Sequence, residues 1–331
     1  MWKYIFSAIG VLLFHPCIKF VVKCSEISDE QPLLLTPYIE SEKNKEARSL
    51  ALVTELTPNI TSYSGFLTIN KECDSNLFFW FFPSQNNWEE DPVTLWLNGG
   101  PGVPSLYGLF YENGPYSLTL NQTLILNEYS WNLNSSMIYI DNPVGTGFSF
   151  SGKECYVENQ EQIGQGILNA LLQFFKLFPE VSRNPFFLTG QSYAGKYIPA
   201  AAHAILNSDQ KNSINFQGVA IGNGWIDPVS QLGFGDYLYH IGLIDQNIKR
   251  KMVSNEENIV KSLGLKRYWM AAYIYGQNIQ LFKKVSGFEF LYNYLFEKDD
   301  SGPDMDLFLN DDEVSSYSLI SLNSKLKMWS D

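Results

Sequence analysis

Short apolar runs, separated by polar and turn-forming residues, mark the first two-thirds of this 331-residue chain. Six runs are rich in β-branched and aromatic residues and predict strands at 64–69, 77–82, 93–97, 137–140, 186–188 and 219–221. Apolar residues at helical spacing follow in 161–178 and again after Ser192. Strands in succession, then strands separated by helices, predict an α/β fold: a mixed central sheet covered by helices on both faces.

The remaining segments divide the chain further. Residues 25–60 are polar and mixed and predict a loosely packed N-terminal arm before a core at 61–230. Residues 231–288 are helical in pattern without strand runs, which predicts a helical cap insertion over the site. Residues 289–331 are acidic and then serine-rich, and we expect them to form an incomplete return to the core.

The N-terminus resembles an export signal. A short basic start precedes an apolar run at 4–14, and polar residues follow Cys24. We predict a signal peptide over residues 1–24, cleaved near Cys24 or Ser25. The alternative is a membrane anchor, which is disfavoured because Pro16 and Lys19 interrupt the run before it could span a bilayer.

Export agrees with three Asn-x-Ser/Thr sequons, which make Asn59, Asn121 and Asn134 candidates for glycosylation. The chain beyond the signal keeps two cysteines, Cys73 and Cys155. They either pair or remain two buried thiols, and the sequence leaves both alternatives open.

Composition and charge exclude some classes of function. The formal net charge of −12 argues against a nucleic-acid or anionic-membrane surface and suits an acidic compartment. There is no Cys/His spacing for zinc, so we expect neither a metal nor another cofactor. The length leaves room for one large domain or two smaller ones.

The strongest chemical motif is Gly190-Gln191-Ser192-Tyr193-Ala194, directly after a predicted strand. Small residues around a serine at a strand-to-helix turn permit the strained nucleophile elbow, which exposes the hydroxyl for attack on a carbonyl. A glycine cluster, Asn98 to Gly102, follows another strand and directs backbone N–H groups at a ligand. In such hydrolases one oxyanion donor comes from this kind of loop and the other from the residue after the nucleophile, here Tyr193.

Five blocks in order resemble the signatures of the serine carboxypeptidase family, and among its members the vitellogenic-like carboxypeptidases most. They lie at 95–102, 112–115, 140–149, 190–197 and 221–228. The resemblance implies an α/β-hydrolase fold and release of single residues from peptide C-termini. It makes Ser192 the nucleophile and the N–H groups of Gly100 and Tyr193 the oxyanion hole. The implied ligands of the substrate's terminal carboxylate are Asn98, Gly99, Glu112 and Gln191.

One departure from the family concerns Gln191, where glutamate is usual. In the family this glutamate shares a proton with the one at the Glu112 position, and such a like-charged pair favours acidic pH. An amide cannot ionise but still donates a hydrogen bond. We therefore expect carboxylate recognition to survive and to depend less on acidity.

The second departure concerns the base that a serine needs. His15 lies in the signal segment, His203 on the helix leaving the elbow, and His240 in the predicted cap; we interpret none of them as the base. The family's Asp and Gly-His blocks would lie downstream of the cap, and neither occurs before Asp331. We expect the last strands of the sheet and two members of the triad to be missing.

Three hypotheses follow. The first is a serine carboxypeptidase in an incomplete form, acting on peptide or protein C-termini through an acyl-enzyme on Ser192. The second is a truncated, catalytically silent relative that binds peptide C-termini. The third is a related acyltransferase, against which the retained Asn98 and Glu112 argue. We expect the secretory pathway, either secretion or a lysosome-like compartment, and no membrane contact after signal removal. The oligomeric state is open.

Overall fold

The computed structural model describes residues 32–53, 60–153, 155–289, 291–293, 295 and 304–309. The predicted signal peptide and the sequon at Asn59 lie outside these residues. None of the described helices combines the length and the apolar character needed to cross a bilayer.

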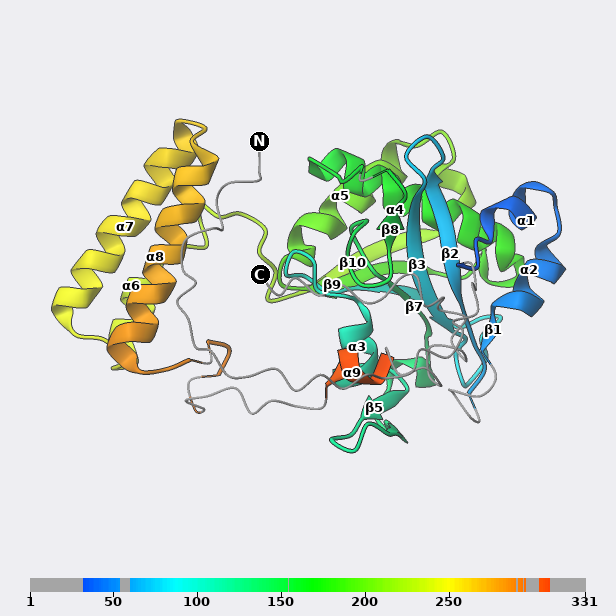
Figure 1. Cartoon of the computed structure of the whole chain (residues 1–331), viewed down its shortest axis with the longest axis horizontal. Helices are drawn as coiled ribbons and strands as arrows, with labels where there is room; N and C mark the ends of the chain where they lie inside the picture. The colour runs from blue at the N-terminus through cyan, green and yellow to red at the C-terminus, as the bar shows by residue number, and fades with distance from the viewer. Residues whose placement is uncertain are drawn as a thin grey trace, which may run out of the picture.

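A mixed sheet forms the centre of the molecule (Figure 1). Its strands run in the order β1-β2-β3-β7-β4-β9-β10, and β8 pairs with β3 at the side. β1, β2, β3 and β7 pair in antiparallel fashion, whereas β7, β4, β9 and β10 are parallel. The bounds are Leu52–Val53 (β1), Ser62–Asn70 (β2), Ser75–Phe82 (β3), Val93–Leu97 (β4), Ser136–Ile140 (β7), Phe150–Ser151 (β8), Phe186–Gln191 (β9) and Phe216–Gly222 (β10). Each of the six predicted strands lies within one of these.

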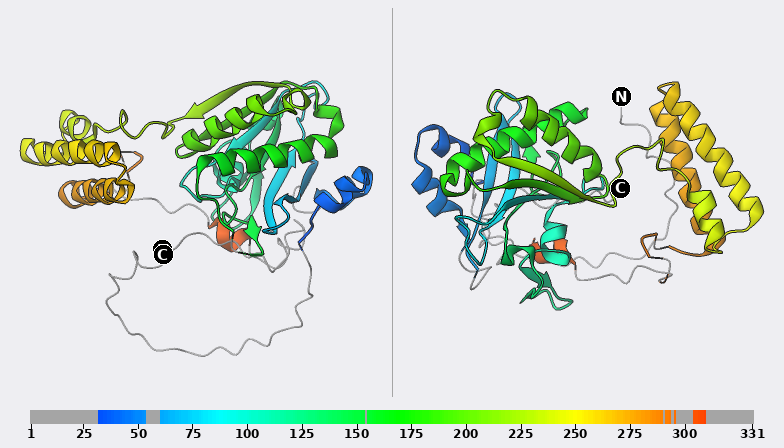
Figure 2. Two further views of the ribbon diagram at one scale, coloured as in Figure 1. Left: turned by 90° about the horizontal axis from the view of Figure 1, so that it is seen from above. Right: turned by 180° about the vertical axis from the view of Figure 1, so that it is seen from behind.

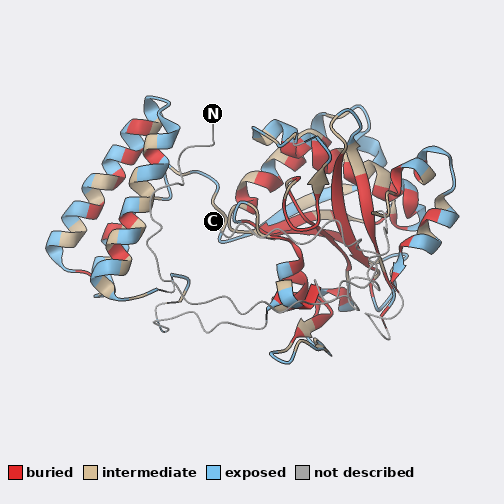
Figure 3. Cartoon of the chain, in the orientation of Figure 1, coloured by how far each residue is buried: buried red, intermediate tan, exposed pale blue. Residues whose placement is uncertain are grey.

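Helices cover both faces of the sheet, as predicted (Figure 2). One face packs against α4 (Gln160–Leu177) and α5 (Ala194–Asn207), and the other against α3 (Leu106–Tyr111) and α9 (Met305–Leu309). Side chains alternate along β3, so this strand contributes to the apolar cores on both faces. Leu77, Phe79 and Phe81 point to the first face, and Phe78, Trp80 and Phe82 to the second. Figure 3 shows β3 buried throughout.

The predicted loosely packed arm is wrong for residues 32–53. They form α1 (Thr36–Glu40) and α2 (Asn44–Ala51), and Leu35, Ala47 and Ala51 are fully buried in the first core. Arg48 of α2 pairs with Glu180. These short helices owe their stability to such tertiary contacts, since isolated helices of this length are marginal in water.

Residues 234–286 form three helices with a small core of their own, around Ile244, Met252 and Phe282. These are α6 (Phe234–His240), α7 (Gln246–Gly264) and α8 (Tyr268–Ser286). Figures 1 and 2 show them beside the sheet, after the segment that follows β10. The role of this helical segment as a cap stays a prediction.

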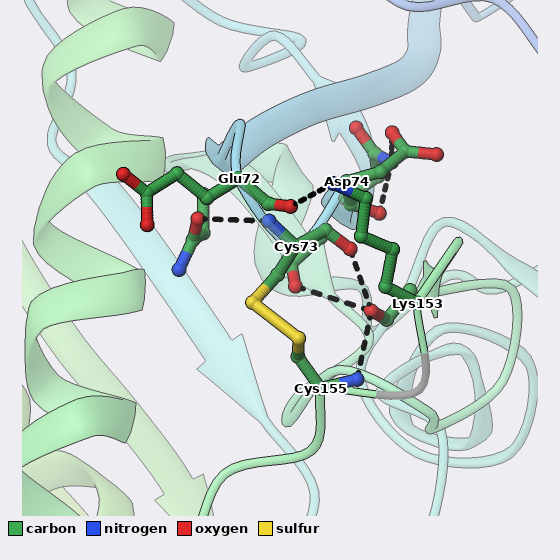
Figure 4. Close-up of a disulfide and its surroundings, with 9 residues drawn as sticks. Glu72, Cys73, Asp74, Lys153 and Cys155 are labelled. Atoms are coloured by element: carbon green, nitrogen blue, oxygen red, sulfur yellow. Dashed lines mark hydrogen bonds between the residues drawn. A yellow bond between two sulfur atoms is a disulfide. The ribbon is translucent and has the colours of Figure 1, made fainter.

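A disulfide, a short hairpin and three single 3-10 turns complete the described fold. Cys73, in the β2–β3 turn, forms a disulfide with Cys155, so the first of the two alternatives holds (Figure 4). A hairpin that the sequence did not predict, β5 (Tyr116–Leu118) with β6 (Leu124–Leu126), follows α3. Single 3-10 turns lie at Trp131–Leu133, Pro179–Val181 and Lys211–Ser213.

Candidate active site

Ser192 stands between the end of β9 and the start of α5 with a backbone φ of +57°. This left-handed conformation is unfavourable for a residue with a side chain, by roughly 1 kcal/mol. Gly190 lets the end of β4 approach the elbow, because a Cβ there would lie 2.2 Å from the carbonyl oxygen of Leu97 and 3.0 Å from the Cβ of Ala194. The geometry is that of the predicted elbow: a serine in a strained turn at the carboxyl end of β9, a strand paired on both sides.

The elbow is held by the end of β10 and by the segment that follows it. The N–H of Ser192 donates to the carbonyl of Gly222 over 3.1 Å, and the N–H of Trp225 donates to the carbonyl of Ser192 over 2.8 Å. Both polar groups of the strained residue are therefore paired with backbone, and that pairing opposes relaxation of the turn.

The glycine loop after β4 lies against the elbow. A Cβ placed on Gly99 would sit 2.4 Å from the backbone nitrogen of Tyr193 and 2.9 Å from the carbonyl oxygen of Gln191. Only a residue without a side chain allows the two backbones to approach so closely. The structure thus brings the neighbouring Gly100 and Tyr193, both predicted oxyanion donors, onto adjoining loops.

Glu112 connects the same two loops. Its Oε1 accepts hydrogen bonds from Nε2 of Gln191 at 2.5 Å and from Nδ2 of Asn98 at 3.3 Å. The predicted carboxylate ligands Asn98, Glu112 and Gln191 therefore form one cluster, and Gln191 is adjacent in sequence to Ser192. The fourth, Gly99, follows Asn98 in sequence and lies against the backbone of Gln191 and Tyr193.

The orientation of the Asn98 amide is fixed by its other side. Oδ1 accepts the indole N–H of Trp96 over 2.7 Å and the backbone N–H of Gly108 over 3.1 Å. With its oxygen occupied, the amide nitrogen faces Glu112, and Asn98 itself is only 3% exposed.

The cluster shifts the titration of Glu112. Partial burial raises the pKa of the Glu112 carboxyl, and the hydrogen bonds from Asn98 and Gln191 lower it to a smaller extent. A group with a raised pKa takes up a proton more readily as the solution is acidified. Protonated, it no longer repels an incoming carboxylate and has a hydrogen to donate to it.

Ser105 and Asp141 support this arrangement, and sequence reasoning gave them no role. The hydroxyl of Ser105 accepts the Asn98 N–H over 3.2 Å and donates to the carbonyl of Ile140. Asp141 is fully buried and accepts the N–H groups of Ser105 (2.9 Å) and Phe148 (3.0 Å). Burial raises the pKa of Asp141 to about 7, against the lowering effect of its backbone donors. Asp141 lies in the third of the five family blocks (140–149), and this position is the sequence signal that could have pointed to it.

The described histidines lie away from the elbow, as the sequence indicated. His203 is exposed on α5, and His240 is exposed on α6 with Nδ1 2.6 Å from the carbonyl oxygen of Asp236. His15 lies outside the described residues. Within the described ranges the Ser192 hydroxyl makes no side-chain hydrogen bond, and no three metal-ligating side chains come together.

The chain is similar to known serine carboxypeptidases. The family model for serine carboxypeptidases matches residues 53–302. The venom serine carboxypeptidase of Apis mellifera is 46% identical over 90% of this chain and 66% of its own length. The vitellogenic carboxypeptidase of Aedes aegypti is 43% identical over 86% and 63%, and the probable serine carboxypeptidase CPVL of Homo sapiens 44% over 82% and 60%. The chain thus spans less than two-thirds of the length of these relatives.

A solved structure matches as well. The prohormone-processing carboxypeptidase Kex1(delta)p of Saccharomyces cerevisiae aligns with a TM-score of 0.65 and 25% identity, over 86% of this chain and 69% of its own. The mixed sheet with helices on both faces is the α/β-hydrolase fold that the sequence predicted. With a family match across most of the described core, the chain belongs to the serine carboxypeptidase family.

Proposed function

We propose that this protein is a serine-type carboxypeptidase that releases C-terminal residues from peptides. The observation that carries the proposal is the junction of two features: the strained elbow at Ser192 and the Glu112–Asn98–Gln191 cluster beside it. One feature suits attack on a carbonyl and the other suits capture of a terminal carboxylate. Their adjacency would select the last peptide bond of a chain.

In the proposed reaction the hydroxyl oxygen of Ser192 attacks the carbonyl carbon of that bond. The N–H groups of Gly100 and Tyr193 would stabilise the oxyanion. Collapse of the tetrahedral intermediate breaks the C–N bond, releases the last residue as an amine and leaves an acyl-enzyme. Water then attacks the ester and frees the shortened peptide. A base takes the proton of the hydroxyl and gives it to the leaving amine, and it then takes a proton from water and returns it to the oxygen of Ser192. The residues described above do not supply this base.

The substrate's carboxylate would bind between Asn98, the N–H of Gly99, Glu112 and Gln191. Both amide side chains donate to Glu112 in the structure, and each has a second N–H with which to hold a ligand. Because Gln191 carries no charge, a single carboxyl, Glu112, governs how acidity affects this step.

A second candidate function is binding of peptide C-termini without hydrolysis. It is favoured by one observation, the exposed positions of His203 and His240 away from Ser192. A serine without a base keeps little of its reactivity, whereas the carboxylate cluster does not need one.

One experiment separates the two. The purified protein is treated with a fluorophosphonate, and labelling at Ser192 is located by mass spectrometry, with Ser192→Ala as control. In parallel, binding of a peptide with a free C-terminus is compared with binding of the same peptide amidated. Labelling together with amino-acid release supports the peptidase. Preferential binding of the free acid without labelling supports the binding protein. If neither labelling nor preferential binding is seen, both functions are rejected.

We further infer that the protein enters the secretory pathway, by secretion or in a lysosome-like compartment. The predicted signal peptide and the exposure of Asn121 and Asn134 support this. A mobility shift on glycosidase treatment, lost in an Asn121→Gln, Asn134→Gln variant, would support glycosylation at these positions. No shift in protein expressed through a secretory host would contradict it.

A further inference from the structure

The loop after β10 bonds to Ser192 through one residue, Trp225. The N–H of Trp225 donates to the carbonyl of Ser192, and Gly222, at the end of β10, accepts the N–H of Ser192. The Ser192 carbonyl also accepts the N–H of Gly195 over 2.9 Å, a bond within the elbow itself. The restraint on Ser192 from outside the elbow therefore depends on where the backbone of β10 and its loop lies, and what fixes the loop also restrains the elbow.

Gln231 fixes the loop on both sides of Trp225. Its Oε1 accepts the N–H groups of Ile226 (2.7 Å) and Asp227 (2.8 Å). Its Nε2 donates to the carbonyl of Gly224 over 2.7 Å. One side-chain amide thus holds the residues immediately before and after Trp225. The three bonds use both ends of the amide, so no other side chain of similar size except glutamine can make all of them.

The loop is also joined to its surroundings. Nζ of Lys196, in the first turn of α5, donates to the carbonyl of Ile226 over 2.6 Å. The ring of Trp225 packs against Tyr275 of α8, with centroids 5.4 Å apart. The loop therefore lies between the elbow helix and the helical segment, with Gln231 at its centre.

We propose that Gln231 is a positioning residue for Ser192, acting through the backbone of Trp225. This inference rests on the proposed role of Ser192 as a nucleophile. Gln231 is exposed, and both the oxygen and the nitrogen of its amide bond to backbone of the loop, so we assign it a role through that backbone and not through substrate. Without it, the N–H of Trp225 is free to leave the Ser192 carbonyl, and Ser192 loses one of its three backbone hydrogen bonds, the one that the loop after β10 donates.

Removal of the amide leaves the rest of the turn in place. The N–H of Gln231 donates to the carbonyl of Asp227, and Oδ1 of Asp227 accepts the N–H of Val229. These bonds do not involve the Gln231 side chain. A Gln231→Ala protein is therefore expected to fold with a looser loop.

The test is hydrogen–deuterium exchange of the full chain, read in peptides that contain Ser192 and Trp225. In Gln231→Ala we expect exchange of both amides to rise about tenfold, the size expected from loss of hydrogen bonds of ordinary strength. Gln231→Glu keeps an acceptor for Ile226 and Asp227 and loses the bond to Gly224. Its exchange rate at Ser192 and Trp225 should therefore lie between those of the unaltered protein and Gln231→Ala. Gln217→Ala is the matched control. Gln217 is an exposed glutamine of β10 whose side chain, among the described residues, bonds only to Asn215, so its loss should not change the exchange of either peptide.

Unchanged exchange at Ser192 and Trp225 in Gln231→Ala would overturn the proposal. So would a rise of equal size in α4, which would mean general destabilisation. If the alanine variant does not fold, Gln231→Glu decides by the same readout. The fluorophosphonate rate adds a functional measure: it should fall in Gln231→Ala, while peptide affinity at the Glu112 cluster holds. If the unaltered protein is not labelled, the proposed function fails, but exchange still decides the positioning role.

Discussion

Gln191 and Glu112 form a pair in which one partner alone can carry a charge. The amide nitrogen of Gln191 lies 2.5 Å from Oε1 of Glu112, at the point where the elbow meets the end of α3. Two carboxyls at this distance would share a proton, and each would raise the pKa of the other. Here the amide donates whatever the pH, so Glu112 titrates without a charged partner in the cluster.

A Gln191→Glu variant should need more acid to bind a peptide carboxylate. The second carboxyl raises the pKa for the shared proton, yet the singly protonated pair still carries one negative charge. As the pH rises, peptide affinity should therefore begin to fall about one pH unit earlier in this variant than in the unaltered protein. The measurement is the Kd, by calorimetry, of a peptide with a free C-terminus between about pH 4 and about pH 8.

Glu112→Gln serves as the matched control for that series. With no titrating group left in the cluster, the affinity of the peptide should become almost independent of pH over the same interval. A Gln191→Glu profile that overlays the unaltered protein would show that Glu112 does not govern carboxylate binding.

Gly99→Ala should destabilise the protein and weaken the site. The new Cβ would meet backbone atoms of Tyr193 and Gln191, which cannot move aside as a flexible side chain would. Overpacking of this kind costs about 1–3 kcal/mol in the free energy of unfolding. Gly276→Ala, within α8 with nothing inside 4 Å of its Cβ position, should instead stabilise by about 1 kcal/mol. Urea unfolding of both variants checks the pair; equal effects would mean that the Gly99 contact is looser than described.

Asp141 should make the protein less stable as pH rises from about 4 to about 7. Its pKa in the folded state is about 7, above the ordinary value, because burial disfavours the charged form. The folded state therefore binds the proton more tightly, and the stabilisation is complete below the unfolded pKa and lost as pH rises through the folded one. Melting temperatures across this interval should fall.

Asp141→Asn should flatten that dependence while lowering stability throughout, since an amide presents one oxygen to backbone donors that now meet two. Asp227→Asn is the control: Asp227 is exposed, and hydrogen bonds from Ser230 and Val229 lower its pKa, so the fall with rising pH should persist. A slope retained in full by Asp141→Asn would assign it to other groups, such as Glu256, whose pKa burial also raises.

Replacing both Cys73 and Cys155 by serine should lower the free energy of unfolding by about 2–4 kcal/mol. The bond closes a loop with a sequence separation of 82, so its loss greatly enlarges the unfolded ensemble. Chemical denaturation with and without reductant checks this. The double variant should be insensitive to reductant, and equal stability of the two proteins would contradict the prediction.

The sequence could predict the elbow and the glycine loop because both are local. Gly190 and Gly99 sit at the ends of apolar strands, and neighbouring parallel strands bring such ends together. The resemblance of five ordered blocks to the family also predicts that Glu112 and Asn98 belong to one site.

Other features depend on contacts that have no local signal. α1 and α2 are too short for a clear apolar period, and Arg48 stabilises α2 by lying over the ring of Phe178, 5.0 Å from its centroid, far along the chain. Gln231 is a polar residue in a polar loop, and only the folded backbone shows what its amide holds. The sequence alone does not decide whether Cys73 and Cys155 pair, because the two cysteines are 82 positions apart.

The place of β10 in the sheet has a consequence for anything that joins it. Among the described strands β10 has one neighbour, β9, and its other side is an edge with exposed residues such as Val219. A further strand added there would lie about 10 Å from β9, two interstrand spacings from the strand that ends at the nucleophile. A segment that pairs with this edge would thus displace or fix the backbone of Gly222, and through the hydrogen bond between Gly222 and Ser192 it would also affect the position of Ser192.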